Sequence, residues 1–312
     1  MNVQVRSLRP ANPGPIYALD ISPNGQQLVL GQQGDDVGSP ILSLWNLENL
    51  QLLSVIDSSS FGIILSARYS SDGRTLAYIN SNFEVCLCDL ERRELYKLDL
   101  ADPHVKWLAF AGKSDRLVTA GLFTHVWDVS RREVIWTLPR ALIKQDTKKI
   151  PIIADLNPNG TQVAVAGLEP NRIVIYDVDH GGIIQSLEGA PAQARWVSFD
   201  PCARCLAAID WFSHGTFLWD LNSGERFLPD FFNLKTEAYW CLRFHPDCEL
   251  LALGTLSGFV VIVHLKNGQY VVEQLVHNGR VWDLAFTSDG KHLVSGGDDG
   301  IAYVLELDEL YR

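Results

Sequence analysis

Residues 277–307, HNGRVWDLAFTSDGKHLVSGGDDGIAYVLEL, contain the pattern that decides the fold. The sequence Ser288-Asp289-Gly290 separates two short apolar runs, and a third apolar run follows and reaches Val304-Leu305. Asp-Gly pairs favour tight turns because glycine accepts a positive φ angle that other residues resist. The stretch therefore predicts three short β-strands joined by tight turns.

The same arrangement repeats along the whole chain. Turn sequences of this kind lie at residues 22–25, 71–73, 157–160, 200–202, 245–247 and 288–290. The third run of each unit closes on a dipeptide, namely Trp45-Asn46, Cys88-Asp89, Trp127-Asp128, Tyr176-Asp177, Trp219-Asp220, Val263-His264 and Val304-Leu305. Successive dipeptides are 39 to 49 residues apart, close to the roughly 40 to 45 residues of a propeller blade. The chain therefore predicts a fold of seven repeated units.

A fourth strand follows each earlier dipeptide, in sequences such as QLLSVI and EVIWTL. The last unit ends too soon for its own fourth strand, whereas Val3 and Val5 alternate with polar residues near the N-terminus. We therefore expect an all-β, seven-bladed β-propeller of four-stranded antiparallel blades, which the N-terminal strand closes. The expected blades of this single domain are residues 11–57, 58–100, 101–139, 151–188, 190–232, 235–276 and 277–307 with strand 2–8.

The repeats resemble those of the WD-repeat family over essentially the whole chain. In that family, a His, a Ser or Thr, an Asp and the Trp of the dipeptide form a hydrogen-bonded set within a blade. The last blade matches the first three of these at His277, Ser295 and Asp299, although its dipeptide lacks the Trp. Other blades keep the Trp without the His, at Trp45, Trp127 and Trp219. The resemblance implies a non-catalytic protein interaction scaffold that needs no cofactor.

Charge and composition bound the function further. The chain has 26 basic and 37 acidic residues, a net charge of −11, which gives no overall attraction to nucleic acid or anionic lipid. No apolar run reaches the about 18 residues that span a membrane. The N-terminal residues lack the charged start and apolar stretch of a secretory signal. We therefore expect a cytoplasmic protein that binds no membrane, and nucleic acid is not favoured as its partner.

Motifs of common enzyme classes are missing from the sequence. Neither an HExxH zinc motif nor a GxSxG nucleophile elbow occurs, and Gly112-Lys113-Ser114 lacks the upstream glycine of a phosphate-binding loop. The acid pairs Asp35-Asp36 and Asp298-Asp299 lie in glycine-rich loops, where carboxylates commonly accept backbone N–H bonds. We therefore expect no catalytic residues.

Four residues in two consecutive units could act as zinc ligands. Cys202 and Cys205 form a CxxC sequence, and His245 and Cys248 lie at the equivalent turn of the next unit. Cys205, however, begins an apolar strand, where a free cysteine behaves as a small hydrophobic residue. The six cysteines are also spaced unlike a secreted disulfide framework. We therefore expect no metal site and no bound cofactor.

The loops that lead into the inner strands of a propeller lie on one rim, and repeat folds commonly use such loops for function. Alignment of the inner strands places seven residues at the equivalent position, which we call the mouth ring: Tyr17, Leu65, Lys106, Ile152, Arg195, Trp240 and Trp282. Trp, Tyr and Arg are enriched at protein–protein hot spots. We therefore expect a protein or peptide partner at Tyr17, Lys106, Arg195, Trp240 and Trp282, with Phe123, Trp211 and Phe212 in neighbouring loops.

A basic insertion enlarges the same rim. The longest spacing contains Arg140, Lys144, Lys148 and Lys149 but one acid, Asp146. This segment, and Lys148 in particular, would attract an acidic peptide or a phosphate-bearing partner. Two other functions stay open: a propeller enzyme with a metal in the central channel, and a nucleic-acid binder that uses residues 140–149. The aromatic residues of the rim could instead pack between blades, in a structural role.

Overall fold

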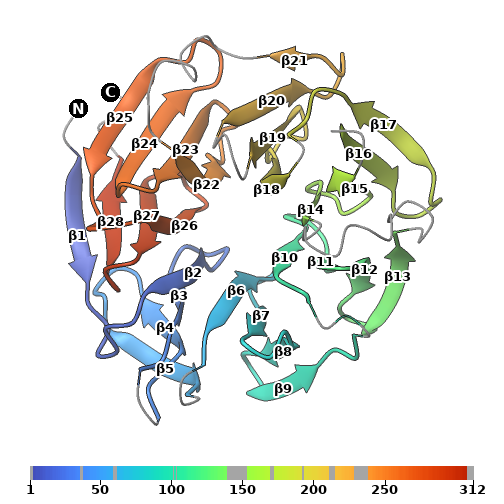
Figure 1. Cartoon of the computed structure of the whole chain (residues 1–312). Coiled ribbons are helices and arrows are strands. Elements are labelled where there is room, and N and C mark those ends of the chain that lie inside the picture. Colours follow the sequence, from blue (N-terminus) through green and yellow to red (C-terminus); the bar gives the residue numbers. More distant parts are fainter. Residues whose placement is uncertain are drawn as a thin grey trace.

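The structure, a computed structural model, is a closed ring of seven antiparallel sheets with four strands each (Figure 1). It describes residues 3–35, 38–58, 62–100, 102, 104–138, 153–168, 172–191, 193–210, 215–227 and 238–307. Within these residues the regular structure consists of strands, without a helix. None of the described residues therefore belongs to a helix of the length and apolarity that crossing a membrane requires. The predicted seven-bladed propeller is confirmed.

The first four blades follow one another along the chain, and their strands run in chain order from the axis outward (Figure 1). Blade 1 contains β2 (Ile16–Ile21), β3 (Gln27–Gln32), β4 (Leu42–Asn46) and β5 (Leu52–Asp57). Blade 2 contains β6 (Ile64–Tyr69), β7 (Thr75–Asn80), β8 (Val85–Asp89) and β9 (Glu94–Lys97). Blade 3 contains β10 (Trp107–Phe110), β11 (Arg116–Ala120), β12 (Thr124–Asp128) and β13 (Glu133–Thr137). Blade 4 contains β14 (Ile153–Leu156), β15 (Gln162–Leu168), β16 (Arg172–Asp177) and β17 (Ile183–Leu187).

The last three blades complete the ring. Blade 5 contains β18 (Ala194–Phe199), β19 (Cys205–Asp210), β20 (Thr216–Asp220) and β21 (Arg226–Phe227). Blade 6 contains β22 (Tyr239–Phe244), β23 (Leu250–Thr255), β24 (Phe259–His264) and β25 (Tyr270–Leu275). Blade 7 contains β26 (Val281–Phe286), β27 (His292–Gly297), β28 (Ala302–Glu306) and, as its outer strand, β1 (Gln4–Leu8).

The N-terminal strand closes the ring, as the sequence predicted. The antiparallel pairing of β1 with β28 runs from Gln4 opposite Glu306 to Leu8 opposite Ala302. An ion pair of 3.2 Å between Arg6 and Glu306 adds to this pairing. Because β1 covers the outer edge of β28, the first and last parts of the chain hold one blade together.

The hairpin turns between the first and second strands of the blades carry the repeated turn chemistry. Four of these turns place a glycine in the left-handed region, with φ angles of 71° to 73°, namely Gly25, Gly73, Gly160 and Gly290. The turns of blades 5 and 6 instead use Ala203, with φ of 56°, and Cys248, with φ of 63°. The predicted turns thus share one backbone shape, although two of them obtain it without glycine.

The hydrophobic core lies between neighbouring sheets. One cluster joins Ile79 and Leu87 of blade 2 to Leu117 and Trp127 of blade 3. Apolar side chains of neighbouring blades therefore pack against one another, whereas the inner strands also carry charged residues, such as the buried Asp283. Packing of this kind fixes the distance and angle between adjacent inner strands, and these strands position the mouth ring.

Candidate functional site

Five inner strands carry a β-bulge at the mouth ring. In blade 1, Ile16 and Ala18 pair with two adjacent residues of β3, so Tyr17 is the extra residue between them. The same shift singles out Leu65, Arg195, Trp240 and Trp282. A bulge bends its strand and redirects the side chain of the extra residue. The aligned residues of the mouth ring therefore share a repeated backbone feature.

Four residues of the mouth ring and one neighbour form a continuous stack, which we call the ladder: Arg195, Trp240, Arg280, Trp282 and Tyr17. The Arg195 guanidinium lies 2.9 Å from the centre of the Trp240 ring, and its Nε donates to the Trp240 carbonyl oxygen at 2.8 Å. Arg280 lies 4.0 Å from the ring centre of Trp240 and 4.5 Å from that of Trp282. Tyr17 ends the stack against Trp282, with ring centres 4.6 Å apart. The ladder thus joins blades 5, 6, 7 and 1.

Asp298 fixes one end of the ladder. One of its carboxylate oxygens accepts the Trp282 indole N–H at 2.6 Å, and the other accepts the Arg280 backbone N–H at 2.9 Å. Asp298 lies in the turn between β27 and β28, where Gly300 takes a φ of 68°. The sequence analysis treated this acid as a turn residue, whereas the structure also makes it the residue that orients Trp282.

The ladder is positively charged and partly buried. Trp240 is 7% exposed, whereas the other four side chains are half-buried. Burial lowers the pKa of Arg195 to about 9, and the neighbouring Arg280 acts in the same direction. Arg195 therefore stays charged at neutral pH. Within the described residues, the Arg280 guanidinium forms no ion pair, and its Nε has no hydrogen-bond partner.

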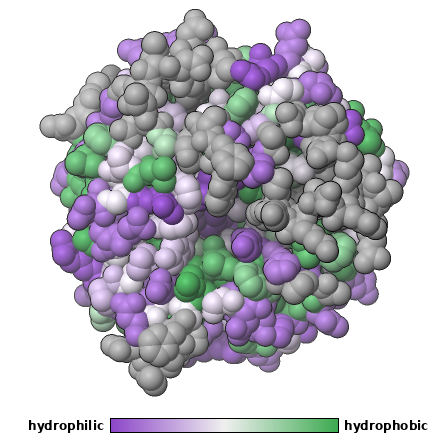
Figure 2. All heavy atoms as spheres, in the orientation of Figure 1, coloured by the Kyte–Doolittle hydropathy of each residue, from purple (hydrophilic) through white to green (hydrophobic). Residues whose placement is uncertain are grey.

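Lys106 and Phe123 lie in and beside blade 3, on the other side of the axis from blade 7 (Figure 1). The Lys106 ammonium lies 5.6 Å from the centre of the Phe83 ring, and Phe123 packs against His125 with ring centres 6.2 Å apart. The structure therefore separates these two residues from the ladder by the central hollow of the ring (Figure 2).

Three other residues that the sequence analysis selected lie outside the described residues. They are Trp211, Phe212 and Lys148, and the insertion of residues 140–149 lies outside them too. Arg280 was missed, because it directly precedes the inner strand β26 and falls outside the alignment of the mouth ring. A signal was present in the sequence: Arg280 is two residues before Trp282, and alternate residues of an extended chain point to the same side.

Charged residues of the inner strands form a second polar group, which we call the axial network: Asp20, Arg68, Asp155, Arg243 and Asp283. Arg68 and Arg243 both pair with Asp283, at 2.8 and 3.0 Å. Asp20 accepts the backbone N–H of Tyr69 in the next blade, and Asp155 accepts that of Phe199, both at 2.8 Å. Burial raises the pKa of Asp155 to about 7. The network links neighbouring inner strands, and its two arginines are compensated by acids.

His277, Ser295 and Asp299 form the hydrogen-bonded set that the resemblance implied for the last blade. His277 Nδ1 lies 2.9 Å from Asp299 Oδ1, and its Nε2 lies 2.8 Å from Ser295 Oγ. These residue types also make up the catalytic triad of hydrolases. Here, however, His277 and Ser295 are buried, so no substrate reaches the hydroxyl. The set therefore stabilises the blade.

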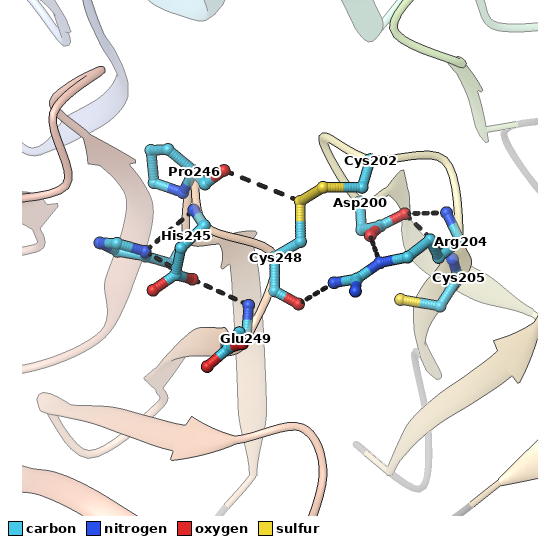
Figure 3. The surroundings of a disulfide bond; sticks show 9 residues. Asp200, Cys202, Arg204, Cys205, His245, Pro246, Cys248 and Glu249 are labelled. Carbon is cyan, nitrogen blue, oxygen red and sulfur yellow. Dashed lines mark hydrogen bonds and ion pairs between the residues drawn. A yellow bond between two sulfur atoms is a disulfide. The ribbon is translucent and has the colours of Figure 1, made fainter.

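The four candidate zinc ligands are not gathered around one point. Cys202 and Cys248 form a disulfide between the turns of blades 5 and 6 (Figure 3), a bond that the sequence analysis did not predict. His245 Nε2 lies 3.0 Å from the Gly290 carbonyl oxygen, in the turn of blade 7. Among the described residues, a carboxylate oxygen of Asp200 lies within 4.8 Å of both sulfurs. The expectation that the chain binds no metal stays a prediction.

Known proteins have sequences similar to parts of this chain. The family described as WD domain, G-beta repeat matches residues 268–304. WD repeat-containing protein SL1-17 of Schistosoma mansoni is 30% identical over 149 residues, which are 47% of this chain and 48% of that protein. WD repeat-containing protein VIP3 of Arabidopsis thaliana is 25% identical over 171 residues, 51% of this chain and 53% of that protein. The matched part of the chain thus spans about half the length of these two relatives.

A third relative is similar over a shorter stretch. The U3 small nucleolar RNA-associated protein 18 homolog of Arabidopsis thaliana is 39% identical over 61 residues, 20% of this chain and 11% of that protein. The repeat match, the WD-repeat relatives and the seven four-stranded blades agree with the hydrogen-bonded set of the last blade. Together they show that the chain is a β-propeller whose repeats are similar to those of the WD-repeat family.

Proposed function

We propose that the chain is a cytoplasmic, non-catalytic scaffold that binds an acidic peptide segment of a partner protein at the ladder. Similarity to WD-repeat proteins supports an interaction scaffold in general, and the ladder supports the choice of surface. One observation carries the proposal. The Arg280 guanidinium lies against two indole rings whose planes are nearly perpendicular, and it has no ion pair within the described residues.

The chemistry of a stacked guanidinium favours a carboxylate as its ligand. The Trp240 and Trp282 rings lie at 86° to each other with centres 5.3 Å apart, so they do not sandwich Arg280, and the N–H groups that they leave uncovered are the ones that a ligand can use. A carboxylate accepts two such N–H groups in parallel, and hydrogen bonds to charged groups contribute about 1.5 to 3 kcal/mol each. Stacking also restricts the Arg280 side chain before the ligand arrives, which lowers the entropic cost of binding.

Arg195 and the aromatic residues extend this surface. Arg195 adds a second positive charge at the other end of the ladder, stacked on Trp240. Tyr17 and Trp282 are half-buried and offer apolar area beside the charges. An acidic residue followed by an apolar side chain would therefore find both kinds of contact along the ladder, as is common at protein–protein hot spots.

Binding of a fluorescein-labelled decaglutamate peptide tests the proposal, with decaglutamine as the neutral control. We expect measurable binding of the acidic peptide alone, and about tenfold weaker binding by Arg280→Gln, because that change removes the charge-assisted hydrogen bonds. Arg131→Gln is the matched control variant, since Arg131 is 75% exposed on the outer side of blade 3. Equal binding by the two variants, or equal binding of the two peptides, would contradict the proposal.

Single-stranded RNA is the competing ligand, because some relatives are named as associated with U3 small nucleolar RNA. Aromatic and arginine stacks also bind bases and phosphates. The same measurement with a labelled uridine decamer separates the two classes. The net charge of −11 does not favour either probe, since decaglutamate carries about as many negative charges as the uridine decamer. Tighter binding of the decamer, with a steep dependence on salt, would identify RNA, and not an acidic peptide, as the ligand of the ladder.

A further inference from the structure

The turns of blades 5 and 6 are joined by the covalent link Cys202–Cys248, on the opposite end of the inner strands from the ladder (Figure 3). The four other cysteines are free and buried. Burial raises the pKa of the nearest of them, Cys205, to about 12, so its thiol stays protonated at neutral pH. Thiol chemistry at this place in the ring therefore concerns Cys202 and Cys248.

The two sulfurs differ in access. Cys202 is exposed, whereas Cys248 is 2% exposed and occupies the left-handed position that is glycine in four other blades. Reaction of a disulfide with a thiol requires that the attacking sulfur reach one of the bonded sulfurs. Cys202 is therefore the more accessible of the two residues, although Cys248 also lines a cavity between the blades.

The two turns are also held together without the disulfide. Arg204 Nη2, from the Cys202 turn, donates to the Cys248 carbonyl oxygen at 2.6 Å. Arg204 Nε lies 3.5 Å from the Asp200 carboxylate, whose other oxygen accepts the backbone N–H groups of Arg204 and Cys205. These contacts, drawn in Figure 3, remain when the sulfur–sulfur bond breaks. The reduced sulfurs then stay close enough to bond again.

We propose that Cys202–Cys248 is a thiol–disulfide exchange site for small thiols such as glutathione, with Cys202 as the exposed sulfur and Cys248 as the buried resolving one. An external thiolate bonds to the Cys202 sulfur, and the electron pair of the broken bond leaves with Cys248, which takes a proton. A second thiolate then bonds to the first external sulfur and releases Cys202, which also takes a proton. One disulfide of the chain is reduced while two small thiols are oxidised to their disulfide.

Exchange at this site changes a cavity between the two blades. Cys248 and Arg204 line this cavity, of about 610 Å³, together with Phe227 and Lys266. The disulfide fixes the Cys248 turn against blade 5, and after reduction the Arg204 hydrogen bond and the apolar packing between the two blades hold the cavity wall. The proposal is independent of binding at the ladder.

Mass spectrometry of single-cysteine variants tests the proposal. After treatment with oxidised glutathione under native conditions, Cys248→Ser is expected to carry glutathione on Cys202, because no resolving thiol displaces it. Cys202→Ser is expected to carry none, because Cys248 is buried. We expect at least about a tenfold difference in adduct between the two variants, in line with the dependence of exchange on access. An adduct on Cys248 equal to that on Cys202, or none on either, would overturn the proposal.

The wild-type chain gives the second measurement. Alkylation in denaturant is expected to label four cysteines in protein prepared without reductant and all six after reduction. Reduction of the native protein is expected to lower the melting temperature by about 5 °C, and oxidised glutathione is expected to restore it. Loss of the folded state on reduction, or labelling of all six without reductant, would show that the site does not cycle as proposed.

Discussion

The blades resemble one another in different ways at the two ends of their inner strands. At the hairpin turns the blades share a residue type, since four of the turns have glycine at one φ angle. At the mouth ring they share a bulge but not a residue: the extra residues are Tyr17, Leu65, Arg195, Trp240 and Trp282. Where the same residue type recurs at the equivalent position of several blades, it meets a requirement that their backbones share. We interpret the equivalent positions that differ as the ones available for binding.

The comparison predicts that changes at the shared features reduce folding stability and that changes at the half-buried members of the ladder reduce binding, whereas Trp240, its buried member, also contributes to stability.

Deletion of residues 1–9 is expected to have the largest effect. It removes β1 and exposes the edge of β28, which invites aggregation. We expect insoluble protein, or a melting temperature at least about 10 °C lower, because the ring loses its closure and several kcal/mol of pairing and packing. Arg6→Gln, which removes the half-exposed ion pair with Glu306 and an exposed hydrogen bond to the Glu48 carbonyl oxygen but keeps β1, is the control and is expected to change little. Normal melting of the truncated chain would contradict this account of closure.

Trp240→Ala tests whether the buried member of the ladder belongs to the core. Because Trp240 is 7% exposed, its truncation is expected to lower the free energy of unfolding by about 3 kcal/mol or more. Trp282→Ala is expected to lower it by less, because Trp282 is half-buried. Urea unfolding of the two variants gives the comparison. Similar losses in the free energy of unfolding would show that Trp240 and Trp282 contribute equally to stability.

Gly290→Ala tests the turn end. An added Cβ would lie 2.2 Å from His245 Nε2, and the φ angle of 72° disfavours alanine as well. We expect a loss of about 2 to 3 kcal/mol in the free energy of unfolding. Gly181→Ala has the same strain, with φ of 76°, but no atom within 4 Å, so about 1 kcal/mol is expected there. Equal losses in urea unfolding would show that the contact between turns contributes nothing.

Asp155→Asn tests the axial network through pH. The folded chain raises the pKa of Asp155 to about 7, mainly by burial, so the protonated form is the one that folding favours. Its contribution to stability is present below about pH 4 and is lost as the pH rises to about 7. The asparagine variant should therefore gain stability relative to the wild type over this range. Parallel pH profiles of the melting temperature would contradict this assignment.

Asp220→Asn provides a control of opposite sign. Backbone N–H groups of Ser223 and Asn222 lower the pKa of Asp220, so its ionised form is the one that folding favours. Its contribution is lost as the pH falls through the lowered pKa, and the asparagine variant should be the less stable one at neutral pH. The same series of melting curves measures both variants.

The fold could be predicted from the sequence because each blade repeats local signals. Turn residues, apolar runs and a spacing of 39 to 49 residues are all local, and the alternation of Val3 and Val5 showed which strand closes the ring. The mouth ring could be aligned for the same reason. These features need no knowledge of which residues meet across blades.

The rest of the site depends on contacts between blades, which local signals do not encode. The position of Arg280 against the indoles of Trp240 and Trp282 follows from how β22 and β26 pack side by side. The axial network joins acids and arginines of blades 2, 6 and 7. Cys202 and Cys248 lie at turns that the sequence did identify. The angle between blades 5 and 6 brings these two turns into contact, and the sequence does not encode that angle locally.

One paired measurement tests the central claim, that the mouth ends of the inner strands bind and the turn ends stabilise. Melting temperature and affinity for decaglutamate are measured for Arg280→Gln and Gly290→Ala, below the melting temperature of both. The account predicts about tenfold weaker binding with little change in melting for Arg280→Gln. It predicts a lower melting temperature with normal binding for Gly290→Ala. Binding that falls in both variants in proportion to their loss of stability would contradict the claim.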